Sequence, residues 1–176
     1  LKSRKSAALP GAKIYPPTLT NSDLANIQIA KEMGVTGVMQ PFVRDHRDLE
    51  CVKEALREAG AEDIRLFAKI ENMDGVRKLE ELFPAADEIV IARGDLGNAV
   101  HLWDLPGVQR QISEKCRAAG KPFMVVTQML ASMERSPVPT RAEVNDIFHA
   151  VMDGAASIMV TGETAVGDYP VEVIRY

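Results

Sequence analysis

The sequence has few aromatic residues, few cysteines and no long run of charge of one sign. Phe, Trp and Tyr make up 5% of the 176 residues, and eight methionines are present, so an aliphatic core with methionine filling gaps is expected. The two cysteines, Cys51 and Cys116, form no Cys-x-x-Cys or Cys/His spacing. We interpret them as buried free thiols, which are typical of a reducing, cytoplasmic compartment.

The net charge and the lengths of the apolar runs count against a nucleic-acid-binding protein and a membrane protein. The formal net charge is -4, without a block of like charge, so neither nucleic acid nor an anionic membrane is an expected partner. No apolar segment reaches the length of a membrane span, and no signal-peptide pattern is present. With 46% hydrophobic residues, the chain suffices for one core, and one globular unit is expected.

The two ends of the sequence suggest a segment of a longer protein. Leu1 is not methionine, and Tyr176 follows closely after a helix start predicted at Pro170. Residues 1–19 carry basic residues, a Pro-Gly turn and a Pro-Pro pair without a sustained period, and are interpreted as an extended connection arriving from elsewhere. Residues 20–176 show regular periodicity and form the predicted folded unit.

Five apolar strands alternate with helices from Thr20 onward. Strands are predicted at 35–43, 65–70, 88–92, 123–128 and 157–161, and helices at 20–34, 45–59, 74–83, 106–119 and 140–152. A capping box marks the helix start at Thr140 with Glu143. Thr20 and Asp23 resemble another helix start, because the Thr hydroxyl can accept from a free amide and the Asp lies at the positive end of the helix. Strands that are apolar through their middle are buried on both faces, which is typical of a parallel α/β sheet.

This order of elements leaves two architectures. Right-handed crossovers between neighbouring strands put every helix on one face, so the sheet closes into a barrel or reverses its strand order. A closed (β/α)8 barrel takes eight units and about 250 residues. We favour part of such a TIM-type barrel over a small doubly wound sheet, because polar residues follow all five strands and no dinucleotide turn or P-loop spacing occurs.

Two strand ends each carry a cation and a carboxylate: Lys69 with Glu71, and Arg93 with Asp95 if the extended conformation persists. In parallel neighbouring strands the two pairs lie side by side, about 4.8 Å apart. Adjacent carboxylates repel unless a cation lies between them, and oxygen ligation by Glu71 and Asp95, with water and substrate oxygens, suits Mg2+ or Mn2+. Simple salt bridges at the strand ends are the alternative interpretation.

Four residues suit the binding of an anion. Lys69 lies within an apolar strand and can act as an electrostatic clamp or as a proton donor. The backbone amides of Gly94 and Asp95 can hold a carboxylate or phosphate, and the hydroxyl of Thr127 can donate to an anionic ligand. These residues predict a barrel enzyme that binds a divalent metal and a small oxyacid, and that stabilises an enolate or transfers a phosphoryl group.

The sequence resembles the pyruvate kinase family over nearly all its length. The resemblance lies in RKSAALPGAK at 4–13, AKIEN at 68–72, ARGDLG at 92–97, GKPFMVVTQMLASM at 120–133, PTRAEVND at 139–146 and TGETAVGDYPVE at 161–172. It implies the fourth to eighth strands of a (β/α)8 barrel, with residues 1–19 returning from a lid domain. It also implies a cytoplasmic homotetramer that transfers the phosphoryl group of phosphoenolpyruvate to ADP, giving pyruvate and ATP.

The resemblance assigns a role to each candidate residue. Lys69 offsets charge on the migrating phosphoryl group and the enolate, and Glu71 and Asp95 hold magnesium. The amides of Gly94 and Asp95, with Thr127, hold the substrate carboxylate, while Arg93 braces the carboxylates. The family's potassium ligands, first three strands, lid and regulatory domain have no counterpart in this sequence, so the 176 residues alone are expected to be inactive.

Two other functions stay open at this point. One is a metal-dependent barrel lyase or aldolase that acts on a pyruvate enolate, and the other is a truncated, non-catalytic protein of pyruvate kinase type that assembles with other subunits. The chain departs from the family pattern close to the active-site end or an interface, at Gln40, Pro41, Asn98, Ala99, Phe148 and His149.

Overall fold

Five parallel strands form one sheet in chain order. The computed structural model describes residues 15–176, and its strands are β1 (Gly37–Gln40), β2 (Arg65–Ile70), β3 (Glu88–Ala92), β4 (Phe123–Val126) and β5 (Ser157–Met159). Each strand pairs in parallel with the next one along the chain. The predicted α/β class, with five consecutive βα units, is confirmed.

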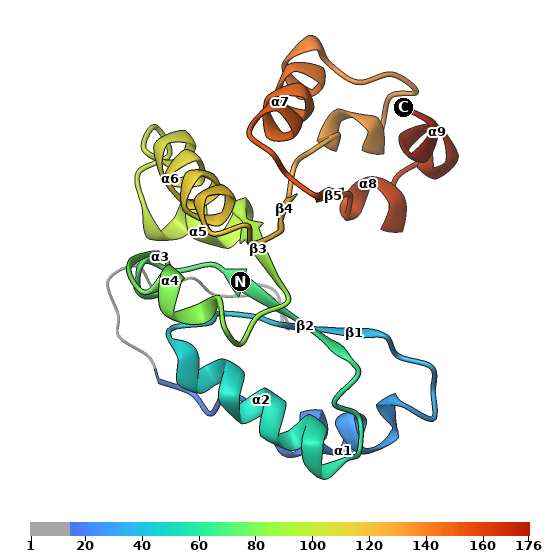
Figure 1. Cartoon of the computed structure of the whole chain (residues 1–176). Helices are drawn as coiled ribbons and strands as arrows, with labels where there is room; N and C mark the ends of the chain where they lie inside the picture. The colour runs from blue at the N-terminus through green and yellow to red at the C-terminus, as the bar shows by residue number, and fades with distance from the viewer. Residues whose placement is uncertain (1–14) are drawn as a thin grey trace.

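The helices alternate with the strands, and the longer ones lie along one side of the sheet. They are α1 (Asn21–Ala30), α2 (His46–Glu58), α3 (Met73–Arg77), α4 (Leu79–Leu82), α5 (Arg93–Ala99), α6 (Leu105–Ala118), α7 (Arg141–Met152), α8 (Gly162–Ala165) and α9 (Pro170–Arg175), with a 3-10 turn η1 (Ala131–Glu134). Figure 1 shows α2, α4, α6 and α7 on the same side of the arc of strands. Crossovers of one hand between neighbouring strands produce this arrangement.

Alternation along the strands divides the buried side chains into two layers. The larger layer packs between the sheet and the helices, and includes Leu66 and Ile70 of β2 and Ile89 and Ile91 of β3. The smaller layer lies on the opposite face, because successive strand side chains point to opposite sides. It contains Val90, Ala92 and Val126, with Phe67, Met124 and Met159 half-buried against them. Lys69 shares the parity of Phe67 and therefore lies on this second face.

Three predicted strands are shorter than expected. The first spans residues 37–40 rather than 35–43, the fourth ends at Val126 rather than residue 128, and the fifth ends at Met159 rather than residue 161. At the first and fourth strands the reason is a positive φ within two residues of the strand end, at Phe42 (52°) and Thr127 (85°). A left-handed residue turns the chain out of the pleated conformation and ends the pairing.

Two other expectations change, and two are met. The helix predicted at 74–83 is two helices, α3 and α4, because Lys78 leaves the helical conformation at φ -101° and ψ 17°. The capping box at Thr140 is present, and the helix start at Thr20 forms a second capping box with Asp23. Cys116 is buried, and burial raises the pKa of its thiol to about 12. Cys51 is exposed, so the expectation that both thiols are buried is wrong for Cys51.

Two sequence predictions remain, one on the N-terminal segment and one on membrane-spanning helices. Residues 1–14, including the stretch 4–13, lie outside the described residues, and residues 15–19 form neither helix nor strand. Among residues 15–176, no helix combines the length and apolar character needed to cross a bilayer.

Candidate active site

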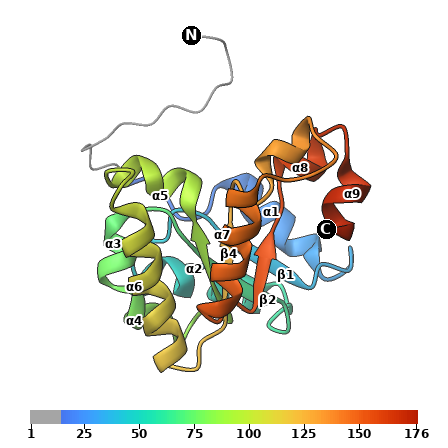
Figure 2. The ribbon, with the colours of Figure 1, turned by 90° about the horizontal axis from the view of Figure 1, so that it is seen from above.

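The carboxyl ends of the central strands bring the predicted site residues to one edge of the sheet. Glu71 directly follows β2, Arg93 opens α5 directly after β3, and Thr127 directly follows β4. Parallel strands end at the same edge, and the β3 to β4 register pairs Ala92 with Val126. Figure 2 shows α5 and α8, which follow β3 and β5, at this common end of the sheet.

Lys69 and Glu71 form a half-buried ion pair at the end of β2. The Lys69 Nζ lies 2.8 Å from Glu71 Oε1, with the lysine side chain 28% exposed and the glutamate side chain 1% exposed. The Phe42 N–H donates to Glu71 Oε2 at 2.7 Å. One carboxylate oxygen of Glu71 thus faces the Lys69 ammonium and the other accepts the Phe42 hydrogen bond. Each oxygen has two lone pairs, so Glu71 is oriented from two sides and retains capacity for a further ligand.

Residues with a strained backbone conformation lie at the same edge of the sheet. Among residues 15–176, the non-glycine residues with positive φ are Phe42, Thr127 and Gln128, which follow β1 and β4. Such a conformation costs about 1–3 kcal/mol and persists where surrounding contacts enforce it. For the β-branched Thr127 it is an outlier. The conformation of Phe42 presents its N–H to Glu71, so the strain there contributes to orienting a predicted site residue.

Gly94 and Thr127 lie in direct contact. A Cβ added at Gly94 would meet Thr127 Cγ2 at 2.9 Å and Thr127 Oγ1 at 3.5 Å. Any residue larger than glycine at position 94 would therefore have to displace the Thr127 side chain. Gly94 and Asp95 lie in the first turn of α5, where no side chain caps the helix start, and first-turn amides have no partner within their helix. The predicted anion-binding groups of residues 94 and 127 are thus adjacent.

Arg93 makes contacts that the sequence did not predict. The expected extended conformation is wrong, because Arg93 and Asp95 both lie in α5. Two residues along a helix are rotated by about 200°, so the pair does not share a side as it would in a strand. Arg93 Nη1 instead lies 2.6 Å and 2.9 Å from the carboxylate oxygens of Asp146 in α7, and Nη2 donates to the Thr127 carbonyl at 2.6 Å.

The predicted metal ligands, Glu71 and Asp95, have different surroundings. Glu71 is buried, whereas Asp95 is exposed and makes no ion pair or side-chain hydrogen bond within residues 15–176. Within the same residues, no group of three or more His, Cys, Asp or Glu side chains is placed to hold a metal. An oxygen donor set of two carboxylates suits Mg2+ or Mn2+, which keep water and substrate oxygens as further ligands, and does not suit zinc.

Sequence reasoning assigned no role to Asp146 or to Glu163. Asp146 lies four residues before the buried Ala150, and this spacing on α7 is the signal that places it on the inward face. Glu163 is buried and accepts hydrogen bonds from the N–H groups of Leu130 (3.1 Å) and Thr161 (2.7 Å). Burial opposes its ionisation, but these backbone bonds prevail and lower the pKa of Glu163.

Comparison with known proteins gives one consistent match. The family model described as pyruvate kinase, barrel domain, matches residues 1–174. Pyruvate kinase from Bacillus licheniformis is 41% identical over 175 residues, which cover 99% of this chain and 30% of that protein. Pyruvate kinase from Dictyostelium discoideum is 41% identical over 174 residues, covering 99% of this chain and 34% of the relative.

A further relative agrees with these. Pyruvate kinase 2 from Saccharomyces cerevisiae is 39% identical over 175 residues, again 99% of this chain and 34% of the relative. The chain therefore spans about a third of the length of the curated relatives it matches.

Proposed function

Because this chain belongs to the pyruvate kinase family, as part of its TIM-type barrel domain, we propose that it supplies catalytic residues for phosphoryl transfer from phosphoenolpyruvate to ADP. The observation that carries the proposal is the half-buried Lys69–Glu71 pair at 2.8 Å, beside strand ends that carry Gly94, Asp95 and Thr127. A loose phosphoryl-transfer transition state needs positioned charges rather than a protein nucleophile, and these strand ends offer such charges.

Each residue has a proposed role in this reaction. The ammonium of Lys69 offsets negative charge on the migrating phosphoryl group and on the enolate oxygen. The amides of Gly94 and Asp95 and the hydroxyl of Thr127 hold the substrate carboxylate. Glu71 and Asp95 are the residues that would hold Mg2+ or Mn2+, and the bound ion would supply charge neutralisation between substrate oxygens.

Several wider expectations belong to the same proposal. We propose that the five strands are the fourth to eighth of the barrel and that residues 1–19 return from a lid domain. We also propose that the complete protein contains potassium ligands outside this segment, acts in the cytoplasm and assembles as a homotetramer. The 176 residues alone are expected not to turn over, since the remaining strands contribute to the site.

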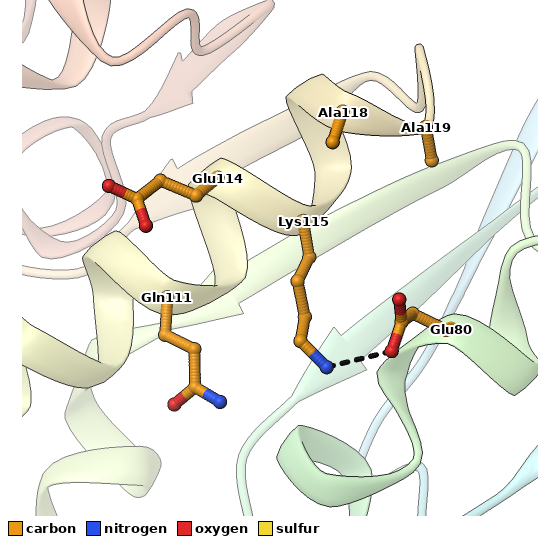
Figure 3. A pocket seen from close by; sticks show the side chains of 6 residues that line it. All are labelled: Glu80, Gln111, Glu114, Lys115, Ala118 and Ala119. Carbon is orange, nitrogen blue, oxygen red and sulfur yellow. Dashed lines mark hydrogen bonds and ion pairs between the residues drawn. The ribbon is translucent and has the colours of Figure 1, made fainter.

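The test is substitution of the Lys69–Glu71 pair in the full natural chain. Lys69→Met or Glu71→Gln is expected to lower kcat for pyruvate formation by about a hundredfold or more, as loss of one preorganised charge does elsewhere. A matched pair on the outer side of the barrel provides the control. Figure 3 shows Lys115 of α6 pairing with Glu80 of α4, also at 2.8 Å. Lys115→Met or Glu80→Gln is expected to leave kcat within about twofold.

Two outcomes would contradict the proposal. If Lys69→Met and Glu71→Gln keep kcat within a few fold of the parent, the assigned roles are wrong. If the parent chain exchanges the methyl protons of pyruvate without dependence on any nucleotide and forms no ATP, the metal-dependent lyase or aldolase interpretation replaces phosphoryl transfer.

A further inference from the structure

The guanidinium of Arg93 joins α7 to the turn after β4. On one side, Nη1 contacts both carboxylate oxygens of Asp146, at 2.6 Å and 2.9 Å. On the other side, Nη2 and Nε donate to the carbonyl of Thr127, at 2.6 Å and 3.2 Å. The Arg93 side chain is 13% exposed. Its planar group is therefore held between a carboxylate and a carbonyl, with little access for water.

The Thr127 carbonyl belongs to the strained residue of the site. Thr127 has a φ of 85° and its side chain rests on Gly94. A β-branched residue holds this conformation only if the surrounding contacts enforce it. Two donors from Arg93 fix the carbonyl, and the contact with Gly94 fixes the side chain. The conformation that presents Thr127 thus depends on the position of Arg93.

Asp146 in turn supplies the anionic partner of Arg93, whose Nη2 also lies 3.0 Å from Met129 Sδ. Among residues 15–176, Asp146 is the carboxylate that contacts this guanidinium. A nearly buried arginine without its anionic partner retains an uncompensated charge and moves toward water. Loss of the Asp146 charge is therefore expected to release Arg93 from the Thr127 carbonyl.

We propose that Asp146 is a positioning residue that acts through Arg93 to hold Thr127 in its substrate-binding conformation. This inference rests on the proposed function, in which Thr127 holds the substrate carboxylate. Asp146 lies on α7, on the helix-covered side of the sheet, and within residues 15–176 its side-chain hydrogen bonds are to the Arg93 guanidinium. Its effect therefore falls on recognition of the substrate carboxylate, and not on the binding of the nucleotide.

The first experiment measures kinetics of the full natural chain with Asp146→Asn, which keeps the shape of the side chain and removes its charge. The KM for phosphoenolpyruvate is expected to rise about tenfold, and the Kd for pyruvate in the presence of Mg2+ to rise similarly, because a misplaced contact weakens binding of the oriented substrate. The KM for ADP is expected to stay within about twofold. Asp146→Glu keeps the charge and is expected to restore the KM for phosphoenolpyruvate to within about threefold.

A second variant tests the route through Arg93. Arg93→Lys keeps the charge and loses the planar fork that reaches both Asp146 and the Thr127 carbonyl, so it is expected to raise the KM for phosphoenolpyruvate about tenfold. In the Arg93→Lys background, Asp146→Asn is expected to add no more than about twofold, because residues that act through one another are not additive. If Asp146→Asn does not fold, an unchanged KM for phosphoenolpyruvate in Arg93→Lys overturns the proposal.

A control on the same helix separates positioning from stability. Glu143 caps α7 and accepts bonds from Ser132, so Glu143→Gln is expected to lower the thermal unfolding midpoint without changing the KM for phosphoenolpyruvate. If Asp146→Asn behaves like Glu143→Gln, or if its effect adds fully to that of Arg93→Lys, the inference is wrong while the proposed function stands. Absence of phosphoryl transfer in the parent chain would instead contradict the proposed function.

Discussion

Gly94 and Thr127, which follow the carboxyl ends of two neighbouring strands, are held in place by close contacts. Gly94 carries Thr127 directly above it, at a separation that leaves no room for a methyl group. Thr127 is fixed from both sides, by Gly94 at its side chain and by Arg93 at its carbonyl. One atom added at residue 94 is therefore expected to disturb the strained turn as a whole.

Gly94→Ala tests this expectation. The new Cβ would lie 2.9 Å from Thr127 Cγ2, so the variant is expected to lose about 1–3 kcal/mol of unfolding free energy, as overpacked sites do. Thr127→Ser removes the clashing methyl group, and Gly94→Ala in that background is expected to cost less than half as much. Denaturant unfolding of the full natural chain measures both effects.

Gly107 provides the matched control for this substitution. It lies in the first turn of α6, and no atom comes within 4 Å of an added Cβ. Gly107→Ala is expected to be neutral or to stabilise by up to about 1 kcal/mol through helix propensity. Equal destabilisation by Gly94→Ala and Gly107→Ala would show that contact with Thr127 has no part in the result.

At the scale of helices and strands, ion pairs at the start of α2 connect two neighbouring βα units. Asp45 caps α2 by accepting from the Arg47 N–H, pairs with the Arg47 guanidinium at 2.6 Å, and receives Lys78, between α3 and α4, at 3.1 Å. The Asp45 side chain is only 9% exposed. The hydrogen bond from Arg47, opposed by burial and supported by Lys78, holds the pKa of Asp45 well below its ordinary value.

Asp45 is therefore expected to stabilise the fold in a pH-dependent way. A carboxyl group whose pKa is lower in the folded state stabilises fully above its unfolded pKa, about 4, and loses that contribution as the pH falls through lower values. Asp45→Asn is expected to cost about 1–2 kcal/mol at pH 7, because Arg47 and Lys78 lose their charged hydrogen-bond partner, and the difference from the parent is expected to shrink at pH 3. Chemical denaturation at the two pH values measures it.

An exposed carboxylate serves as the control at this scale. Asp63 pairs with Lys31 at 3.0 Å, with both side chains largely exposed. Asp63→Asn is expected to change stability by less than about 0.5 kcal/mol at pH 7, because water screens such pairs. A loss for Asp45→Asn that is the same at pH 7 and pH 3 would contradict a contribution from its ionised form.

The whole molecule presents a sheet with one face covered by helices. On the other face, Phe67, Met124 and Met159 are only half-buried against Val90 and Val126. Within residues 15–176, β1 and β5 each pair with one neighbouring strand. The backbone groups along the other side of each of these two strands therefore make no hydrogen bonds within this sheet. Exposed edges and apolar sheet faces promote association with other strands.

The 176-residue chain expressed by itself is therefore expected to self-associate and to form no pyruvate from phosphoenolpyruvate. Met39 of β1 pairs with Phe67 and is 38% exposed, so Met39→Lys is expected to reduce association. Met33, which is 70% exposed beyond the end of α1, provides the control, and Met33→Lys is expected to have no effect. Light scattering after size-exclusion chromatography measures the mass, and a monodisperse monomer of the parent chain would contradict this expectation.

Local patterns in the sequence determined the class of the fold and part of the site. The bounds of β2 and β3 agree with the predicted 65–70 and 88–92, because apolar runs between turn signals depend on nearby residues alone. The Lys69–Glu71 contact follows from the same alternation, since residues two apart in an extended chain point to one side. Both capping boxes likewise involve residues only three apart.

Tertiary structure alone decided the remaining contacts of the site. Asp146 reaches Arg93 across 53 residues of sequence, and the Phe42 N–H reaches Glu71 across 29. The positive φ at Thr127 opposes the preference of a β-branched residue, and the contacts of its carbonyl and side chain maintain it. Such partners come from separate βα units, and they meet only because parallel strands bring their carboxyl ends to one edge.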